Sequence, residues 1–517
     1  MVDYSLEEYI EQIGMLHRDE HTDACIEQQT GTNAIESRKW KANTNIIFLS
    51  HRSVGNDGLD KLVHAILNAH QMEKECRHRS HRNSNDSGSL QQDDDSRMYL
   101  AKKIHLRCTN IKRGITSLAS LLSRSNSTEV LDLSLNDLGN ECITELCDAI
   151  SSQCHERSSL HSMFLRRCQI SCQGVISIAS LLVPSNSEWA PLPIKTLDLS
   201  RNEVGNDGVT ALAQAISWNG CSLQALDLSR CNIAAERSRG LHRLFSVLLS
   251  SARNAAIVSA NRACIHTSME DIRVPLAEHT SNLVSLKLNG NDLQSDCFNS
   301  IAACIAGDSF TDDNNNREVH YCPSLQNLYL DNTNMSSSSA KKLAKALVTN
   351  TDLKMLSLCE NSIGDDAAKA FADGLRCNRT LSFLLLGRSK YMTQEGVEAL
   401  ANCVFDERRN GSLLALAASN NVIEGFGLGN QTSIRLEYAL HFNGNGNDEC
   451  SIQRKKIASF LNRDCVRTMH HFAAFLEQLN RNVGRSTALP FVVNNCNLSC
   501  TFEMMRGMPE VCFQVRS

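Results

Sequence analysis

Clustered histidine and cysteine residues are the first place to look for chemistry in this chain, because imidazole and thiolate groups bind zinc and act as nucleophiles. His70, Cys76, His78 and His81 lie near one another in the sequence. The paired C-x-x-C halves of a strong zinc site are absent, and so is an H-E-x-x-H motif. We therefore interpret the cluster as part of a polar insertion and predict no metal site.

Other sequence patterns that could indicate a catalytic or binding site are equally weak. Cys168 and Cys172, like Cys496 and Cys500, have the spacing C-x-x-x-C and are predicted to be structural. Residues 425–429 are rich in glycine but lack the strand–turn–helix setting of a dinucleotide site. No glycine-rich loop is followed by Lys and Ser or Thr, so an NTPase-type phosphate loop is absent. The sequence predicts neither a catalytic residue nor a cofactor, and therefore no enzyme.

A repeated sequence motif runs along most of the chain. Its form is L-x-x-L-x-L-x-x-(N/C/T/S)-x-(L/I/V), the pattern of a leucine-rich repeat, and LQALDLSRCNI at residues 223–233 shows it in full. The last Leu of L-x-L, here called the marker leucine, recurs about every 28 to 29 residues. The marker leucines are Leu49, Leu106, Leu133, Leu165, Leu199, Leu228, Leu288, Leu330, Leu358 and Leu386, and Ala418 takes the slot once.

Each unit has two halves with different periods. The L-x-L half alternates, which predicts a short strand, and the second half places apolar residues at the helical period, as in Val209 to Ile216. Parallel strands lie about 4.8 Å apart and packed helices about 8–10 Å apart, so the stack must bend. The fold class predicted is α/β: a right-handed βα leucine-rich repeat solenoid, a horseshoe with a parallel concave sheet and convex helices.

The third residue after the marker leucine, here called the exit slot, is small and polar in most repeats. Asn alternates there with Cys, Thr or Ser. A side chain of this kind hydrogen-bonds the backbone where the strand turns away. The exit slots are Arg52, Thr109, Asn136, Cys168, Asn202, Cys231, Asn291, Thr333, Asn361, Ser389 and Asn421.

This alternation and the unit length resemble the ribonuclease-inhibitor type of leucine-rich repeat. Similar repeats occur in NLR-class receptors and in Ran GTPase-activating proteins. The resemblance covers residues 46–422 and implies the fold, a protein partner and the concave sheet as binding surface.

Residues beside the marker leucines are predicted to point into the concavity. They carry both charge signs with aromatic rings between them, and interfaces favour aromatic and arginine side chains at their centres. The candidate partner-binding residues are Phe164, Arg166, Arg167, Asp198, Arg201, Asp227, Arg230, Lys287, Tyr329, Asp331, Glu360, Phe383 and Arg388.

Three regions are expected. Residues 1–43 form an N-terminal cap segment, residues 44–432 a solenoid of about 11–12 repeats, and residues 433–517 a C-terminal capping region. Polar insertions interrupt the solenoid near 73–97 and 307–320, and the second is interpreted as a polar loop. The long interval between Leu228 and Leu288 predicts a degenerate repeat around residues 257–261.

Composition limits partners and compartment. A net charge of −5 over 517 residues, without a long basic run, lacks the electrostatic footprint of a nucleic-acid-binding protein. No signal peptide and no membrane span are expected. Many of the 22 cysteines fall on helical core faces, as Cys147 and Cys304 do, so a reducing, cytoplasmic setting is expected.

The function predicted is a non-catalytic intracellular scaffold, a monomer, that binds a protein partner on the concave face. Two alternatives remain open: a small-GTPase regulator of the GTPase-activating type, and an enzyme-inhibitor protein. The acidic C-terminal tail typical of the first is missing, and the mixed charge of the face does not suit a basic ribonuclease.

Overall fold

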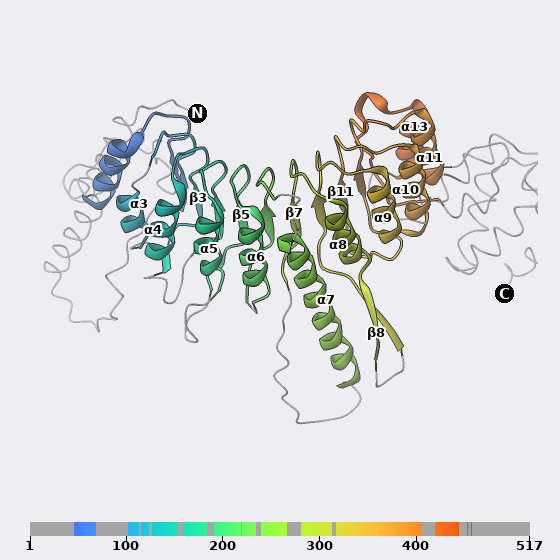
Figure 1. Ribbon diagram of the computed structural model, residues 1–517, viewed down its shortest axis with the longest axis horizontal. Helices are drawn as coiled ribbons and strands as arrows, with labels where there is room; N and C mark the ends of the chain where they lie inside the picture. Colours follow the sequence, from blue (N-terminus) through green and yellow to red (C-terminus); the bar gives the residue numbers. More distant parts are fainter. Residues whose placement is uncertain are drawn as a thin grey trace, which may run out of the picture. The chain divides into compact units, whose positions relative to one another are not determined.

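Three-residue strands precede the marker leucines, and each is followed by a helix (Figure 1). The computed structural model describes residues 46–68, 102–112, 115–123, 127–151, 159–183, 191–218, 220–233, 239–265, 281–312, 317–405, 419–443, 452 and 456. The chain divides into two units, one of residues 1–255 and 270–287 and one of residues 256–269 and 288–517.

The first unit contains seven parallel strands in chain order. They are β1 (Ile46–Phe48), β2 (Lys103–His105), β3 (Val130–Asp132), β4 (Ser162–Phe164), β5 (Thr196–Asp198), β6 (Ala225–Asp227) and β7 (Ser285–Lys287). A helix over residues 55–68 follows β1. The next helices are α3 (Thr116–Ser123), α4 (Gly139–Ser151), α5 (Cys172–Leu181) and α6 (Gly205–Ile216), which pack side by side, and α7 (Arg239–Ile265) begins in this unit.

The second unit continues the pattern with parallel strands β10 (Asn327–Tyr329), β11 (Met355–Ser357) and β12 (Phe383–Leu385). Helices α8 (Ser295–Ala306), α9 (Ser337–Ala346), α10 (Asp365–Cys377) and α11 (Gln394–Val404) pack in sequence, and α13 (Ile434–Asn443) packs on α11. A short 3₁₀ helix, η2 (Gly429–Gln431), precedes α13. An antiparallel hairpin, β8 (Asp308–Asp312) and β9 (Arg317–Tyr321), stands between α8 and β10.

The core lies between strands and helices. The middle residue of each strand and the marker leucine are buried, as Leu131 and Leu133 are. On α4 the buried residues include Ile143, Leu146, Cys147 and Ile150, spaced at the helical period. This confirms the two-period repeat and the α/β leucine-rich repeat solenoid predicted from the sequence. None of the described helices is long and apolar enough to cross a membrane.

Exit-slot side chains tie the repeats together through buried hydrogen bonds, as predicted. The Asn202 amide oxygen accepts hydrogen bonds from the Cys168 and Ile170 backbone N–H groups, at 2.9 and 3.1 Å. Its Nδ2 donates to the carbonyl oxygens of Leu165 and Leu199, at 2.7 and 2.9 Å. Asn136 and Asn361 make the same four contacts with their own neighbours. We call this set the asparagine ladder.

Sequence expectations fail at three places. Residues 257–261 lie within α7 and form no strand, because β6 pairs directly with β7 and leaves no place in the sheet for a hidden repeat. Residues 307–320, expected as a polar loop, supply most of the β8–β9 hairpin, whose strands satisfy each other's backbone groups. The third failure is the register of the last repeat.

The strand position after β12 belongs to Gly425 and Phe426, whose carbonyl oxygens accept from Leu384 N and Leu386 N at 3.1 and 2.9 Å. Leu428 therefore takes the marker slot that Ala418, outside the described residues, was expected to fill. Asn420 lies in the preceding loop, where its Nδ2 donates to the carbonyl oxygen of Asn378 at 3.0 Å. The apolar run LLALAA at residues 413–418 imitates the repeat pattern, but the backbone hydrogen bonds select the later segment.

Several regions named above lie outside the described residues: the N-terminal segment 1–43, the insertion 73–97, and the cluster of His70, Cys76, His78 and His81. Of residues 433–517 the structure describes 433–443, 452 and 456. There α13 buries Leu436 and Ala439, and the buried Lys456 ammonium donates to the Asn420 carbonyl oxygen at 2.8 Å.

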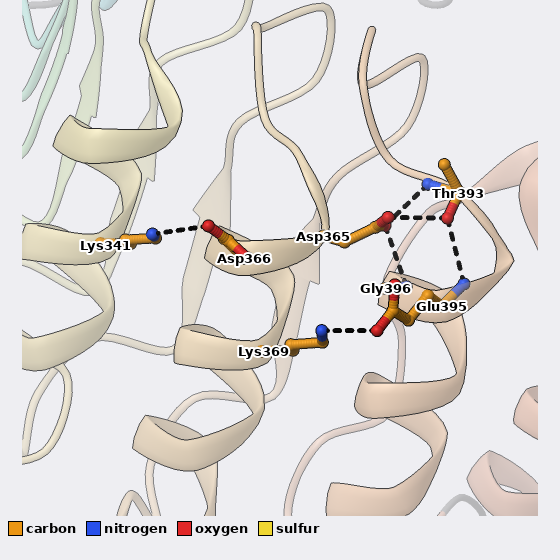
Figure 2. Close-up of polar contacts among 7 residues, drawn as sticks. All are labelled: Lys341, Asp365, Asp366, Lys369, Thr393, Glu395 and Gly396. Atoms are coloured by element: carbon orange, nitrogen blue, oxygen red, sulfur yellow. Dashed lines mark hydrogen bonds and ion pairs between the residues drawn. The ribbon is translucent and has the colours of Figure 1, made fainter.

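On the helical side, the first turn of one helix caps the next. In Figure 2, the Asp365 carboxylate accepts hydrogen bonds from Thr393 N, Thr393 Oγ1 and Gly396 N, at 2.8, 2.7 and 2.9 Å. A Cβ at Gly396 would lie 2.6 Å from Asp365 Oδ1, so this approach needs glycine. In α4 the amide oxygen of Asn140 accepts from Ser171 N and Gly174 N in the same way, at 2.8 and 3.2 Å.

The asparagine ladder predicts a large loss of stability for Asn202→Ala. The substitution leaves two buried N–H groups and two carbonyl oxygens without that partner, so we expect a loss of about 2–4 kcal/mol. Urea unfolding followed by circular dichroism measures it. Gln214→Ala, at an exposed position of α6, is the control and should change little; equal effects of both substitutions would show that the ladder contributes no special stability.

Asp365 predicts a pH dependence of stability. Partial burial favours a raised pKa for this carboxyl group, but hydrogen bonds from Thr393 and Gly396 outweigh burial and hold the pKa below its usual value. The ionised carboxylate therefore stabilises the fold above the unfolded-state pKa, and this contribution is lost as pH falls through the lowered folded-state value. The stability difference between wild type and Asp365→Asn should be present near neutral pH and shrink below about pH 4.

The reciprocal variant Asn140→Asp is the matched control, since it should acquire the pH dependence that Asp365→Asn loses. Urea midpoints at several pH values measure both. A constant difference between wild type and Asp365→Asn across the acid range would contradict the assignment.

Candidate interaction face of the sheet

The first and third residues of each strand point away from the helices. Together with the exposed or partly exposed residues that follow the marker leucines, they form the surface here called the open face. In the first unit the third residues pair in register from strand to strand. Apart from Phe48, half of whose surface is exposed, all are partly buried. The row is Phe48, His105, Asp132, Phe164, Asp198, Asp227 and Lys287.

The open face is a continuous polar and aromatic strip. The Phe48 and His105 rings lie 5.7 Å apart, and His105 Nδ1 lies 3.9 Å from the Asp132 carboxylate. Sequence reasoning selected Phe164, Asp198, Asp227 and Lys287 but missed Phe48, His105 and Asp132, which occupy the same strand position. Counting back one residue from every marker leucine would have found all of them.

The aspartates of the L-D-L-S motif stabilise the turn that follows their own strand. The carboxylates of Asp132, Asp198 and Asp227 accept hydrogen bonds from the backbone N–H of the serine two residues on, at 3.0, 2.8 and 2.9 Å. Asp227 also lies 3.7 Å from the Lys287 ammonium. Burial, aided by the nearby Asp227, raises the pKa of Asp198 despite the hydrogen bonds from Ser200. The charges of these three aspartates are therefore partly used in interactions within the protein.

The second residue after each marker leucine, here called the turn slot, adopts a left-handed backbone conformation. Arg167, Arg201 and Arg230 have φ values of 53°, 59° and 55°. The N–H groups of Arg167 and Arg201 donate to the carbonyl oxygens of Ser200 and Ser229, at 2.9 and 2.8 Å. The turn slot therefore continues the strand-to-strand hydrogen bonding while the chain reverses, which leaves the side chain exposed.

Four arginines of the first unit lie near one another: Arg166, Arg167, Arg201 and Arg230. The positive charge of Arg166 lowers the pKa of Arg201 most, followed by burial and by Arg230 and Arg167. Arg166 Nε is buried and has no hydrogen-bond partner among the described residues. We call these four residues the arginine cluster.

In the second unit the candidate residues are better paired. The turn-slot residues Glu360 and Arg388 form an ion pair at 2.7 Å. The Asp331 carboxylate accepts hydrogen bonds from the Ser357 hydroxyl and from Cys359 N. Tyr329 and Phe383 are half-buried, on the third residue of β10 and the first residue of β12. The structure thus places the candidate residues on two faces, one in each unit.

The cysteines whose side chains the structure describes are free thiols. The Cys168 and Cys231 thiols donate to the carbonyl oxygens of Leu133 and Leu199, at 3.2 and 3.1 Å, and burial raises the pKa of both to about 12. Such thiols are protonated and unreactive. Within the described ranges, no three His, Cys, Asp or Glu residues are arranged to hold a metal ion.

Comparison with known proteins agrees with this geometry. A family model described as Leucine Rich repeat matches residues 193–213 and 221–236, which include β5, most of α6, and β6. NACHT, LRR and PYD domains-containing protein 5 of Homo sapiens is 26% identical over 326 residues, covering 59% of this chain and 26% of that protein. NACHT, LRR and PYD domains-containing protein 3 of Mus musculus is 27% identical over 298 residues, covering 55% and 28%.

Among solved structures, the leucine-rich repeat-containing protein LegL7 from Legionella pneumophila is 17% identical, covers 62% of this chain and 92% of its own, and has a TM-score of 0.33. A chain of the yeast Rad7 and Elc1 complex is 15% identical, covers 66% and 77%, and has a TM-score of 0.31.

The chain therefore has the leucine-rich repeat fold. Its repeats are similar to those of the NACHT, LRR and PYD domains-containing proteins. It spans about a quarter of the length of these curated relatives, since the matches cover 26% and 28% of them. Leucine-rich repeats are generally a protein-interaction fold.

The turn slot predicts which substitutions the face tolerates. Asn adopts the left-handed region readily, whereas a β-branched residue there is strained. Arg201→Asn should leave the urea midpoint near that of wild type, and Arg201→Val should lose about 1–2 kcal/mol of stability. Urea unfolding of both variants tests this. Similar stability of the Asn and Val variants would mean that the turn can relax away from its left-handed conformation.

Proposed function

We propose that this chain is a non-catalytic scaffold that binds a protein partner through the open face of its sheet. The observation that carries the proposal is the row of aromatic, arginine and acidic side chains that the helices leave uncovered. Partly buried Phe164 and Tyr329 offer rigid apolar area, and exposed Arg167 and Arg201 offer charge at the rim.

We expect the helical side to offer less to a partner, because charged residues on successive helices of the second unit pair with one another. Lys341 pairs with Asp366 at 3.0 Å and Lys369 with Glu395 at 2.6 Å, both between successive helices (Figure 2). Exposed apolar residues on or near the helices, such as Ile176, Trp218 and Val348, are far apart in the sequence. Single exposed apolar residues are normal on protein surfaces.

The proposal extends to the compartment. The chain would work inside the cell, because buried free thiols such as Cys168, Cys231 and Cys304 fill core positions and persist in a reducing environment. The similarity to the repeats of the NACHT, LRR and PYD domains-containing proteins supports an interaction role, because leucine-rich repeats are generally a protein-interaction fold.

Open-face residues should be needed for partner capture. We expect Arg166→Ala, in the first unit, or Tyr329→Ala, in the second, to reduce capture of a partner without unfolding the protein. Affinity capture from a lysate of the source cells, followed by mass spectrometry, measures it, and circular dichroism checks the fold. Each variant reports on its own unit.

Lys369→Ala, on the helical side, is the control and should retain the partner. A partner retained equally by wild type and by both open-face variants would place the binding surface elsewhere. A partner lost only with Lys369→Ala would move it to the helices.

A further inference from the structure

We infer that the arginine cluster binds an acidic peptide segment of the partner, a short run of Asp and Glu residues. This rests on the proposed function and deepens it, since it names the chemistry that the open face of the first unit recognises. The four side chains come from the strand exits of three successive repeats, after β4, β5 and β6.

The cluster is held together by the sheet. Because Arg167 N bonds Ser200 O and Arg201 N bonds Ser229 O, the turn slots of neighbouring repeats are in register. Parallel strands are about 4.8 Å apart, so Arg167, Arg201 and Arg230 start from adjacent positions at that pitch. Arg166 adds a half-buried fourth guanidinium beside them. The fold thus forces like charges together that would separate on a flexible chain.

The described residues compensate these charges little: the positive charge of Arg166 lowers the pKa of Asp198, but less than burial raises it. None of the four arginines forms an ion pair with a carboxylate of the described residues. The contrast within the same chain is clear, since Arg388 at an equivalent turn slot pairs with Glu360. The mutual repulsion of the cluster lowers the pKa of Arg201 although that side chain is exposed.

The neighbouring aspartates Asp198 and Asp227 form no ion pair with the arginine cluster. Asp198 and Asp227 each accept a hydrogen bond from their own turn, and Asp227 also faces Lys287. Carboxylates of a partner would relieve the repulsion, because each guanidinium presents paired donors that match a carboxylate. Phe164, in register with Asp198 in the next strand, offers apolar contact to a residue beside the acidic run.

The surroundings favour a peptide over a nucleic acid. Nucleic-acid binding depends on an extended basic track that follows the phosphate backbone. This cluster covers three repeats only, and Asp198 and Asp227 lie three residues before Arg201 and Arg230 in the same repeats, where they would repel a bulky polyanion. A short acidic segment that follows the turn slots can place its charge on the arginines without covering the aspartates.

The test is a binding titration of the full chain with a fluorescein-labelled ten-residue peptide of alternating Glu and Asp, followed by fluorescence anisotropy. Wild type should bind it, and added salt should weaken the binding. The triple variant Arg167→Asn, Arg201→Asn and Arg230→Asn keeps residues that tolerate the left-handed turn and should bind at least about tenfold more weakly.

The matched control replaces Lys341 and Lys369, basic residues on the helical side, with Asn and should bind as wild type does. If the triple variant loses its circular dichroism signal, Arg201→Asn alone carries the comparison, with a smaller expected loss of affinity. Three results would overturn the inference: no binding by wild type, unchanged binding by the arginine variant, or equally tight binding of a ten-residue oligouridylate.

The same measurements separate this inference from the proposed function. If the acidic peptide does not bind but Arg166→Ala or Tyr329→Ala still reduces partner capture, the open face binds a partner of other chemistry and only the inference fails. If partner capture ignores every open-face variant, the proposed function fails. Displacement of a captured partner by the acidic peptide supports both.

Discussion

The structure depends on one constraint: each strand is only three residues long, and the chain must then turn away while its backbone groups stay buried. Buried amide and carbonyl groups without partners cost free energy. The asparagine ladder meets this cost, since one Asn202 side chain satisfies two N–H groups and two carbonyl oxygens across two repeats. The slot before Asn202 in the ladder holds the smaller Cys168, whose own N–H bonds that asparagine, which explains the alternation of residue types.

This turn also creates the surface. Because the exit slot is buried, the residue before it must reverse the chain, and it does so with positive φ in the described repeats, from His51 to Arg388. The reversed residue is held at the edge of the sheet, and in Arg167, Arg201 and Arg230 its side chain is exposed. The interaction that stabilises the core therefore presents a row of side chains at sheet spacing. Whether that row is neutral, as at Glu360 and Arg388, or strongly positive depends only on the residues placed there.

Charged residues have different roles on the helical side and on the open face. On the helical side, Asp365 caps the next helix, and lysines pair with acids of the neighbouring helix, so charge is used for stability. On the open face, the aspartates brace their own turns, and four arginines remain without an ion pair among the described residues. Like charges gathered beside a half-buried Phe164 are costly for folding and useful for binding, which is why we propose this face for the interaction.

The sequence by itself determined the repeat, the strand positions, the buried leucines and the hydrogen-bonding role of the exit slot, because these follow from local spacing and residue type. It failed at residues 257–261 and at Ala418, where an apolar run imitates the pattern and only pairing with the preceding strand decides which segment enters the sheet. It placed the candidate arginines on one face but not their mutual approach or their lack of carboxylate partners. The tertiary structure decided these, because they depend on register between residues some thirty positions apart, such as Arg167 and Arg201.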